Sequence, residues 1–151
     1  MKRRSLLALP FAVGLVQPVR AADAQLPAPQ SLADELAAAL AAQKPLLLMA
    51  SLPGCPFCRV VRNSYLAPLR ESGQPVLQLD TGSAAAVRDF RGAASTHDKL
   101  LRAWGLTVWP TVLFFGRNGR EVAERLVGAS IPDFYGAYLD ERLQTAVRSL
   151  R

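Results

Sequence analysis

The sequence contains only two cysteines and one histidine, and this scarcity limits the metal chemistry open to it. A structural zinc ion normally has four cysteine or histidine ligands. Cys55, Cys58 and His97 together supply three. A zinc site is therefore the weaker interpretation of the cysteine pair, and we expect neither a bound metal nor another cofactor.

Basic clusters and membrane-spanning runs are also missing. The apolar segment Ser5–Val16 is too short to span a bilayer comfortably. The chain has 18 lysine and arginine residues against 12 acidic ones, but residues 1–21 hold four of the basic and none of the acidic residues. The remainder has 14 basic and 12 acidic residues, a net charge of +2 with His97 neutral. This near balance, without a basic cluster, argues against nucleic acid as a partner.

The first 21 residues are organised like a secretory signal peptide. The basic start Lys2-Arg3-Arg4 precedes the apolar segment, and Val19-Arg20-Ala21 has small residues at the positions that signal peptidase reads. The alternative is a buried N-terminal helix, which the prolines at positions 10 and 18 disfavour. We expect cleavage near Ala21, a periplasmic protein with no stable membrane anchor, and cysteines in an oxidising compartment.

Both cysteines lie between a predicted strand and a predicted helix. The apolar run Leu46–Ala50 shows no polar alternation, as expected for a strand buried on both faces, and a helix is predicted from Cys55 to about Arg70. A helix N-terminus favours an anion, because its N–H groups are unpaired and its dipole end is positive. For Cys55 that anion is the thiolate, the attacking form of cysteine. Cys58, one turn later, can attack the resulting mixed disulfide.

Redox chemistry is thus favoured over the structural alternatives for this pair. A structural disulfide between Cys55 and Cys58 would close so small a loop that it would constrain the unfolded chain little. A C-x-x-C sequence between a strand and a helix is a fairly strong redox signal. We therefore predict that these two cysteines are catalytic and form a redox-active disulfide.

Three stretches together resemble the thioredoxin-fold family. They are the strand leading into Cys55-Pro56-Phe57-Cys58, the later Val108-Trp109-Pro110-Thr111, and the hairpin-like sequence 111–129. The resemblance covers about residues 32–150. It implies an α/β fold with a mixed central sheet of about four to five strands and helices on both faces. It also implies a cis peptide bond before Pro110, with this proline beside the active disulfide.

The resemblance further implies a substrate groove beside the cysteines, with Pro56, Phe57, Trp109, Pro110 and Thr111 as its candidate residues. Strongly oxidising periplasmic members have a histidine where this chain has Phe57, so we expect reduction or isomerisation rather than strong oxidation. Trp109 departs from the small or β-branched residue usual before this proline. Its ring either forms a wall of the groove or belongs to the core.

A proton relay attributed to thioredoxins is missing. Met49 and Val76 stand where thioredoxins have a buried acid and a lysine. Proton handling must then rely on water or on another side chain. Asp80 and His97 are the candidates, and the alternative for each is a solvated surface residue.

The rest of the sequence predicts a linker at 22–30 and one thioredoxin-like domain over 31–151. The region 81–105 is longer than in compact thioredoxins. Further elements are expected as helices over 32–43, around 83–90, over 95–104 and from 131 onward, and as strands over 76–80, 111–115 and 120–126.

These observations predict an exported thiol:disulfide oxidoreductase that reduces or isomerises disulfides of an exported protein. Cys55 would be the nucleophile and Cys58 the resolving thiol, with a membrane-bound or soluble thiol protein as electron donor or acceptor. The alternative is a binding module in which Trp109 and Phe57 contact a partner and the cysteines are incidental.

Overall fold

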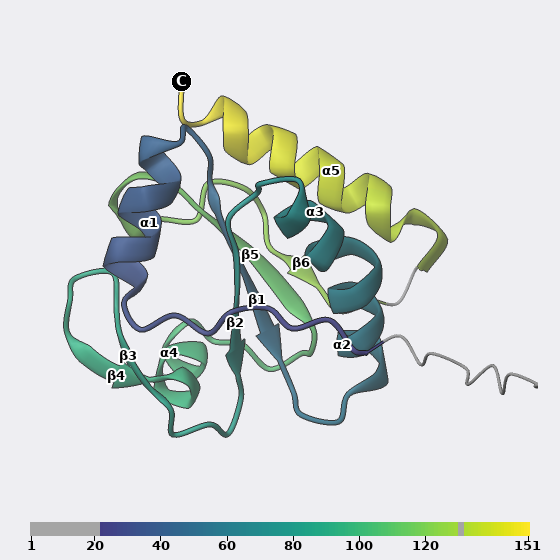
Figure 1. Cartoon of the computed structure of the whole chain (residues 1–151), viewed down its shortest axis with the longest axis horizontal. Coiled ribbons are helices and arrows are strands. Elements are labelled where there is room, and N and C mark those ends of the chain that lie inside the picture. The colour runs from purple at the N-terminus through teal and green to yellow at the C-terminus, as the bar shows by residue number, and fades with distance from the viewer. Residues whose placement is uncertain (1–21, 130–131) are drawn as a thin grey trace, which may run out of the picture.

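A four-stranded mixed sheet forms the centre of the computed structural model, which describes residues 22–129 and 132–151; the predicted signal peptide lies outside them. The strand order is β2-β1-β5-β6 (Figure 1). Strand β1 runs parallel to β2 and antiparallel to β5, which pairs antiparallel with β6. The strands are β2 (Val76–Asp80), β1 (Leu46–Ser51), β5 (Thr111–Phe115) and β6 (Leu126–Val127).

Helices cover both faces of this sheet, because alternate residues of β1 point into two separate cores. Leu46, Leu48 and Ala50 belong to the core beneath α1 (Leu32–Ala41) and α4 (His97–Ala103). Leu47 and Met49 belong to the core beneath α2 (Pro56–Val61) and α5 (Pro132–Arg148) (Figure 1). All six residues of β1 are buried. The predicted α/β fold, with a mixed sheet between two helical layers, is confirmed.

The helix predicted from Cys55 to about Arg70 is present but is not regular. It starts as α2, widens into the π-helical turn η1 (Arg62–Leu66) and ends as α3 (Ala67–Glu71). Pro68 accounts for the widening, because proline has no N–H to donate to the carbonyl four residues earlier.

The helix expected around residues 83–90 is wrong. The chain there forms β3 (Ala86–Arg88), which pairs antiparallel with β4 (Ala94–Thr96). Asp89 closes the turn, since its Oδ1 accepts the N–H groups of Arg91 at 2.8 Å and Ala93 at 2.9 Å. Gly92 adopts the left-handed φ of 82° that this turn needs. The alanine content of this segment favours a helix, but the Asp89 turn and the pairing of β3 with β4 stabilise a hairpin instead.

The strand expected over 120–126 is shorter than predicted. Glu121 makes a single bridge to Phe115, and a ladder forms only at β6, whose Val127 pairs with Thr111. The predicted turn before it is present as residues 117–119, with positive φ at Asn118 and Gly119.

Residues 22–30, expected as a linker, pack against the domain. Leu26 is buried in the core beneath α2 and α5. The Pro27 carbonyl accepts the N–H of Gln78 at 3.0 Å, and the Ala24 N–H donates to Asn63 Oδ1 at 3.2 Å. Tertiary contacts therefore begin before residue 31.

Candidate functional site

Cys55 occupies the N-cap of α2, immediately after the loop that follows β1. Its N–H donates to the Leu52 carbonyl at 3.2 Å, and its Sγ accepts the N–H of Cys58 at 3.1 Å. Pro56 fits the first helical position because it has no N–H that needs a partner there. The sulfur thus takes the place of a capping oxygen, and the amide dipole pointing at it stabilises negative charge on Cys55.

The two cysteines differ in access to solvent. Both are free thiols, Cys55 half-buried and Cys58 fully buried. Burial raises the pKa of the Cys58 thiol, and its hydrogen bond with Cys55 raises it further. Hydrogen bonds from the Leu52 backbone and the Ser51 side chain oppose this rise. The reduced pair therefore combines an accessible sulfur beside a helix amide with a buried sulfur that holds its proton.

The predicted groove residues differ in their exposure and packing. Phe57 is 59% exposed, and Trp109 packs, half-buried, against the core that contains both cysteines. The Trp109–Pro110 peptide bond is cis. Thr111 differs, because it is only 1% exposed and its Oγ1 donates to the Val108 carbonyl at 2.7 Å. Thr111 therefore holds this loop in place rather than lining an open groove, and Trp109 serves partly as core.

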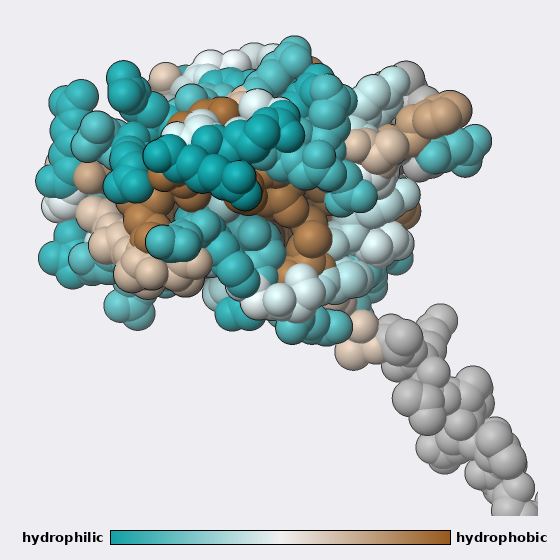
Figure 2. All heavy atoms as spheres, turned by 90° about the horizontal axis from the view of Figure 1, so that it is seen from above, coloured by the Kyte–Doolittle hydropathy of each residue, from teal (hydrophilic) through white to brown (hydrophobic). Residues whose placement is uncertain are grey.

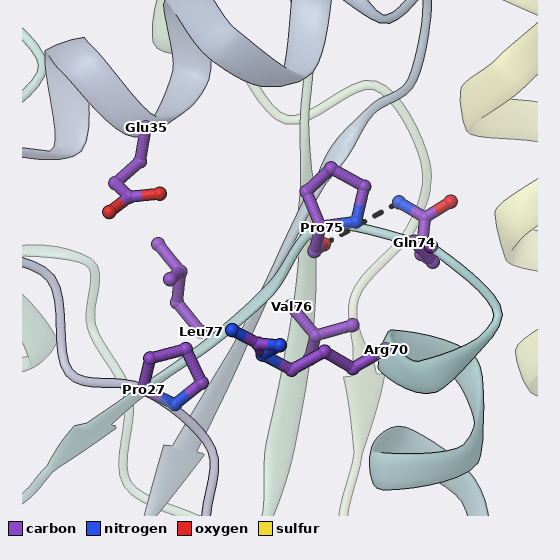
Figure 3. A pocket seen from close by; sticks show the side chains of 8 residues that line it. Pro27, Glu35, Arg70, Gln74, Pro75, Val76 and Leu77 are labelled. Atoms are coloured by element: carbon purple, nitrogen blue, oxygen red, sulfur yellow. Dashed lines mark hydrogen bonds between the residues drawn. The ribbon is translucent and has the colours of Figure 1, made fainter.

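The opposite end of the sheet has a different surface. Figure 2 views the molecule from the end where β1 and β2 begin, and hydrophilic side chains cover most of it, with apolar atoms mainly in hollows between them. A pocket of about 300 Å³ lies there, lined by Pro27, Glu35, Arg70, Gln74 and neighbouring residues (Figure 3). Gln74 donates its amide to the Pro45 carbonyl at 2.6 Å. This pocket shares no residue with the cysteine site and presents no nucleophile.

His97 is not the solvated residue considered as one alternative. It is 3% exposed, and its Nδ1 accepts the N–H of Asp80 at 3.3 Å. Burial lowers the pKa of the imidazole, and the Asp80 carboxylate partly offsets this. This hydrogen bond ties α4 to β2, so the histidine has a structural role in supporting β2.

This burial predicts a pH-dependent stability. Protonation of His97 places a charge in the core and turns the Nδ1 acceptor for the Asp80 N–H into a donor. Since the folded state lowers the pKa, the unfolded state binds more protons, and stability is complete above about pH 6.5 and falls below it. The slope should be at most about 1.4 kcal/mol per pH unit for one proton.

Chemical denaturation at several pH values measures this slope, and His97→Asn is the matched control. The asparagine amide oxygen can accept the same N–H but does not titrate. The stability difference between wild type and variant should shrink as the pH falls from 6.5. Parallel profiles would contradict the assignment.

Two residues at the site were missed by sequence reasoning. Ser51 is the buried last residue of β1 and hydrogen-bonds Cys58. Tyr135 of α5 is 4% exposed, and its hydroxyl has no hydrogen-bond partner within the described residues. Burial raises the pKa of this phenol, and the nearby Tyr65 and Cys58 raise it further. No local sequence pattern shows that Tyr135 lies near Cys58.

Residues 22–129 and 132–151 contain neither a candidate metal centre nor a candidate membrane span. Within this part of the chain, no three histidine, cysteine, aspartate or glutamate side chains come together to hold a metal ion. None of the helices there is long and apolar enough to cross a membrane.

Comparison with known proteins identifies the family. A family model described as a thioredoxin-like domain matches residues 32–142. None of the curated proteins matches this chain.

Solved structures share the fold at low sequence identity. A DsbH oxidoreductase is 16% identical, with 88% of this chain and 92% of that chain covered and a TM-score of 0.51. A putative thiol:disulfide interchange protein DsbE from Chlorobium tepidum is 17% identical, with 77% and 84% covered and the same TM-score of 0.51. A chain from a complex of ferredoxin:thioredoxin reductase with thioredoxin f2 is 19% identical, with 78% and 96% covered, again at 0.51.

Proposed function

Because the chain belongs to the thioredoxin-like domain family, we propose that it is a thiol:disulfide oxidoreductase that reduces or isomerises disulfides of a partner protein. One observation carries this proposal. Cys55 is a half-buried free thiol whose Sγ accepts the N–H of Cys58 at 3.1 Å, while the second thiol of the pair is fully buried beside it. An accessible, anion-stabilised sulfur next to a protected one is what two-step thiol exchange requires.

The proposed reaction has two exchange steps. The Cys55 thiolate attacks one sulfur of the partner disulfide, forms a mixed disulfide, and releases the other partner sulfur as a thiolate that takes up a proton. Cys58 then loses its proton to solvent and attacks Cys55 Sγ. The Cys55–Cys58 bond forms, the mixed disulfide breaks, and the second partner sulfur leaves as a thiolate. Two electrons pass from the dithiol to the partner.

The residues around Cys55 support the proposed direction of electron transfer. Its thiolate is stabilised by the helix N-terminus, and the exposed Phe57 adds no polar or charged group. A disulfide becomes a strong oxidant when its reduced form is strongly stabilised. This limited stabilisation supports reduction or isomerisation over strong oxidation.

We also propose that the protein works in the periplasm, from which residues 1–21 would have been removed. A membrane-bound or soluble thiol protein would then return the dithiol to its reduced state. N-terminal sequencing of the protein from a periplasmic fraction tests this. A retained Met1 in a cytoplasmic fraction would contradict it.

Turnover of a protein disulfide tests the activity. With dithiothreitol as reductant, the reduced protein should accelerate the reduction of insulin, and Cys55→Ser should return the rate to that of dithiothreitol alone. Equal rates for wild type and Cys55→Ser would favour the binding module. That alternative draws support from the exposure of Phe57, but Trp109, packed against both cores, is poorly placed for it.

A further inference from the structure

A chain of polar side chains leads from Cys58 to the second strand of the sheet. The Ser51 side chain hydrogen-bonds Cys58, and Arg62 Nη2 donates to Ser51 Oγ at 3.4 Å. Arg62 Nε also donates to Gln78 Oε1 at 2.8 Å. The Gln78 amide in turn donates to Asp80 Oδ1 at 2.7 Å. A guanidinium is thus connected to the buried thiol through one hydroxyl.

The fold brings these residues together from three elements. Ser51 ends β1 and pairs with Asp80 in the parallel register with β2, where Gln78 lies two residues earlier. Arg62 follows Cys58 by four positions along the helix, which places both on the same helical face. Arg59, only one position after Cys58, turns elsewhere: its side chain is 64% exposed and pairs with Asp23 at 3.5 Å.

This arrangement suits a thiolate at Cys58. A buried anion is costly unless donors point at it. When the Ser51 oxygen accepts a hydrogen bond from a cation, its own O–H becomes a stronger donor to sulfur. Gln78 holds the planar guanidinium in place through a second hydrogen bond.

We propose that Arg62 is a positioning residue that acts through the Ser51 hydroxyl to stabilise the Cys58 thiolate while it resolves the mixed disulfide. The inference rests on the proposed function. In this step the Cys58 proton goes to solvent, Cys58 Sγ bonds to Cys55 Sγ, and the partner sulfur leaves with the electron pair of the broken bond.

The other groups that face Cys58 do not provide a positive charge. They are the Cys55 thiol and the Leu52 backbone at the start of the helix, and Tyr135 from α5, with Tyr65 beside it. Arg62 is the cation that donates to Ser51, whose side-chain hydrogen bond lowers the pKa of the Cys58 thiol.

Reaction of the reduced protein with 5,5′-dithiobis(2-nitrobenzoate) separates the two steps, because each releases one coloured thiolate. Attack by Cys55 gives the first phase and resolution by Cys58 the second. At neutral pH, Ser51→Ala should slow the second phase about tenfold and Arg62→Met about three- to tenfold, as expected for loss of a hydrogen bond to a charged group. The first phase should change by less than about twofold, since neither residue contacts Cys55 in the chain of bonds described.

The pH profile distinguishes this role from a merely structural one. The second-phase rate depends on the thiolate fraction of Cys58, so the variants should approach the wild-type rate at alkaline pH, where the thiol ionises without help. The second phase of the double variant Ser51→Ala/Arg62→Met should be no more than about twofold slower than that of Ser51→Ala. The two effects should not add, because Arg62 acts on Cys58 through the Ser51 hydroxyl.

Arg59→Met is the matched control, since it removes the same charge from the same helix but outside the polar chain. It should leave the second phase unchanged. Equal slowing by Arg59→Met and Arg62→Met would overturn the inference in favour of a general charge effect. Slowing by Tyr135→Phe without slowing by Arg62→Met would assign the role to the phenol instead.

The outcomes also separate this inference from the proposed function. The absence of a Cys55-dependent first phase in the wild-type protein would contradict the proposed function itself. If the wild type is biphasic and Arg62→Met has the same second-phase rate, the inference about Arg62 alone would be wrong. This comparison requires that Arg62→Met shows a normal thermal unfolding transition.

Discussion

Replacing Cys58 with serine should convert a transient mixed disulfide into a stable covalent complex and reduce disulfide turnover to background. The half-buried Cys55 can still attack a partner disulfide, and residue 58 keeps the N–H that donates to Cys55 Sγ. A serine hydroxyl is a weak nucleophile and cannot complete the second exchange. The partner then stays bound until an external thiol arrives. Cells that express Cys58→Ser should show higher-mass species on non-reducing gels, which a reductant collapses.

Cys55→Ser is the control for this experiment. Its remaining thiol, Cys58, is fully buried, so it should capture far less partner. More trapping by Cys55→Ser than by Cys58→Ser would mean that the two roles are reversed. No trapping by either variant, in the compartment where the protein resides, would favour the binding module.

Gly119→Ala should cause a large loss of stability, because it adds both backbone strain and a steric clash. Gly119 has a φ of 65°, a conformation that costs alanine roughly 1–2 kcal/mol. A Cβ there would also lie 2.6 Å from Cγ of Phe90. That ring cannot retreat easily, because its centroid lies 4.7 Å from that of Phe115 and 6.2 Å from that of Trp104. Overpacking of this kind costs about 1–3 kcal/mol more. Urea unfolding should therefore show a loss of about 2–5 kcal/mol in total.

Gly92→Ala separates the two contributions to this loss. Gly92 has a similar φ of 82°, but no described atom lies within 4 Å of a Cβ built there. It should cost only the backbone part, roughly 1–2 kcal/mol. Phe90→Ala should cost less in the Gly119→Ala background than in the wild type, because removing the ring there also removes the clash. Equal losses for Gly92→Ala and Gly119→Ala would show that Phe90 yields.

Strands β1, β2 and β5 and the start of the active-site helix followed from local sequence, and the α/β architecture followed from the resemblance to the thioredoxin-fold family. Leu46–Ala50 is apolar at every position, which suits only a strand covered on both sides, and the helix that follows starts where Cys55 and Pro56 predict. Strands β2 and β5 could likewise be predicted from their apolar sequences. These features depend on residues adjacent in the chain, so periodicity and capping suffice to find them.

Sequence reasoning failed where residues distant in the chain decide the outcome. The alanine-rich segment before Arg88 could have been a helix, and its pairing with β4 through the Asp89 turn made it a strand. His97 looked like a surface residue until the packing of α4 against β2 buried it. A side chain's burial depends on what packs over it, and no local pattern encodes that.

The polar surroundings of Cys58 also depend on residues that are distant in the chain. Ser51, Arg62 and Gln78 are ordinary residues in the sequence, 11 to 16 positions away from their partners. Only the parallel register of β1 with β2, and the helix that crosses above them, brings the guanidinium to the hydroxyl beside the thiol. Hydrogen bonds form over about 3 Å, so they arise from the final packing of elements rather than from the residues of any one element.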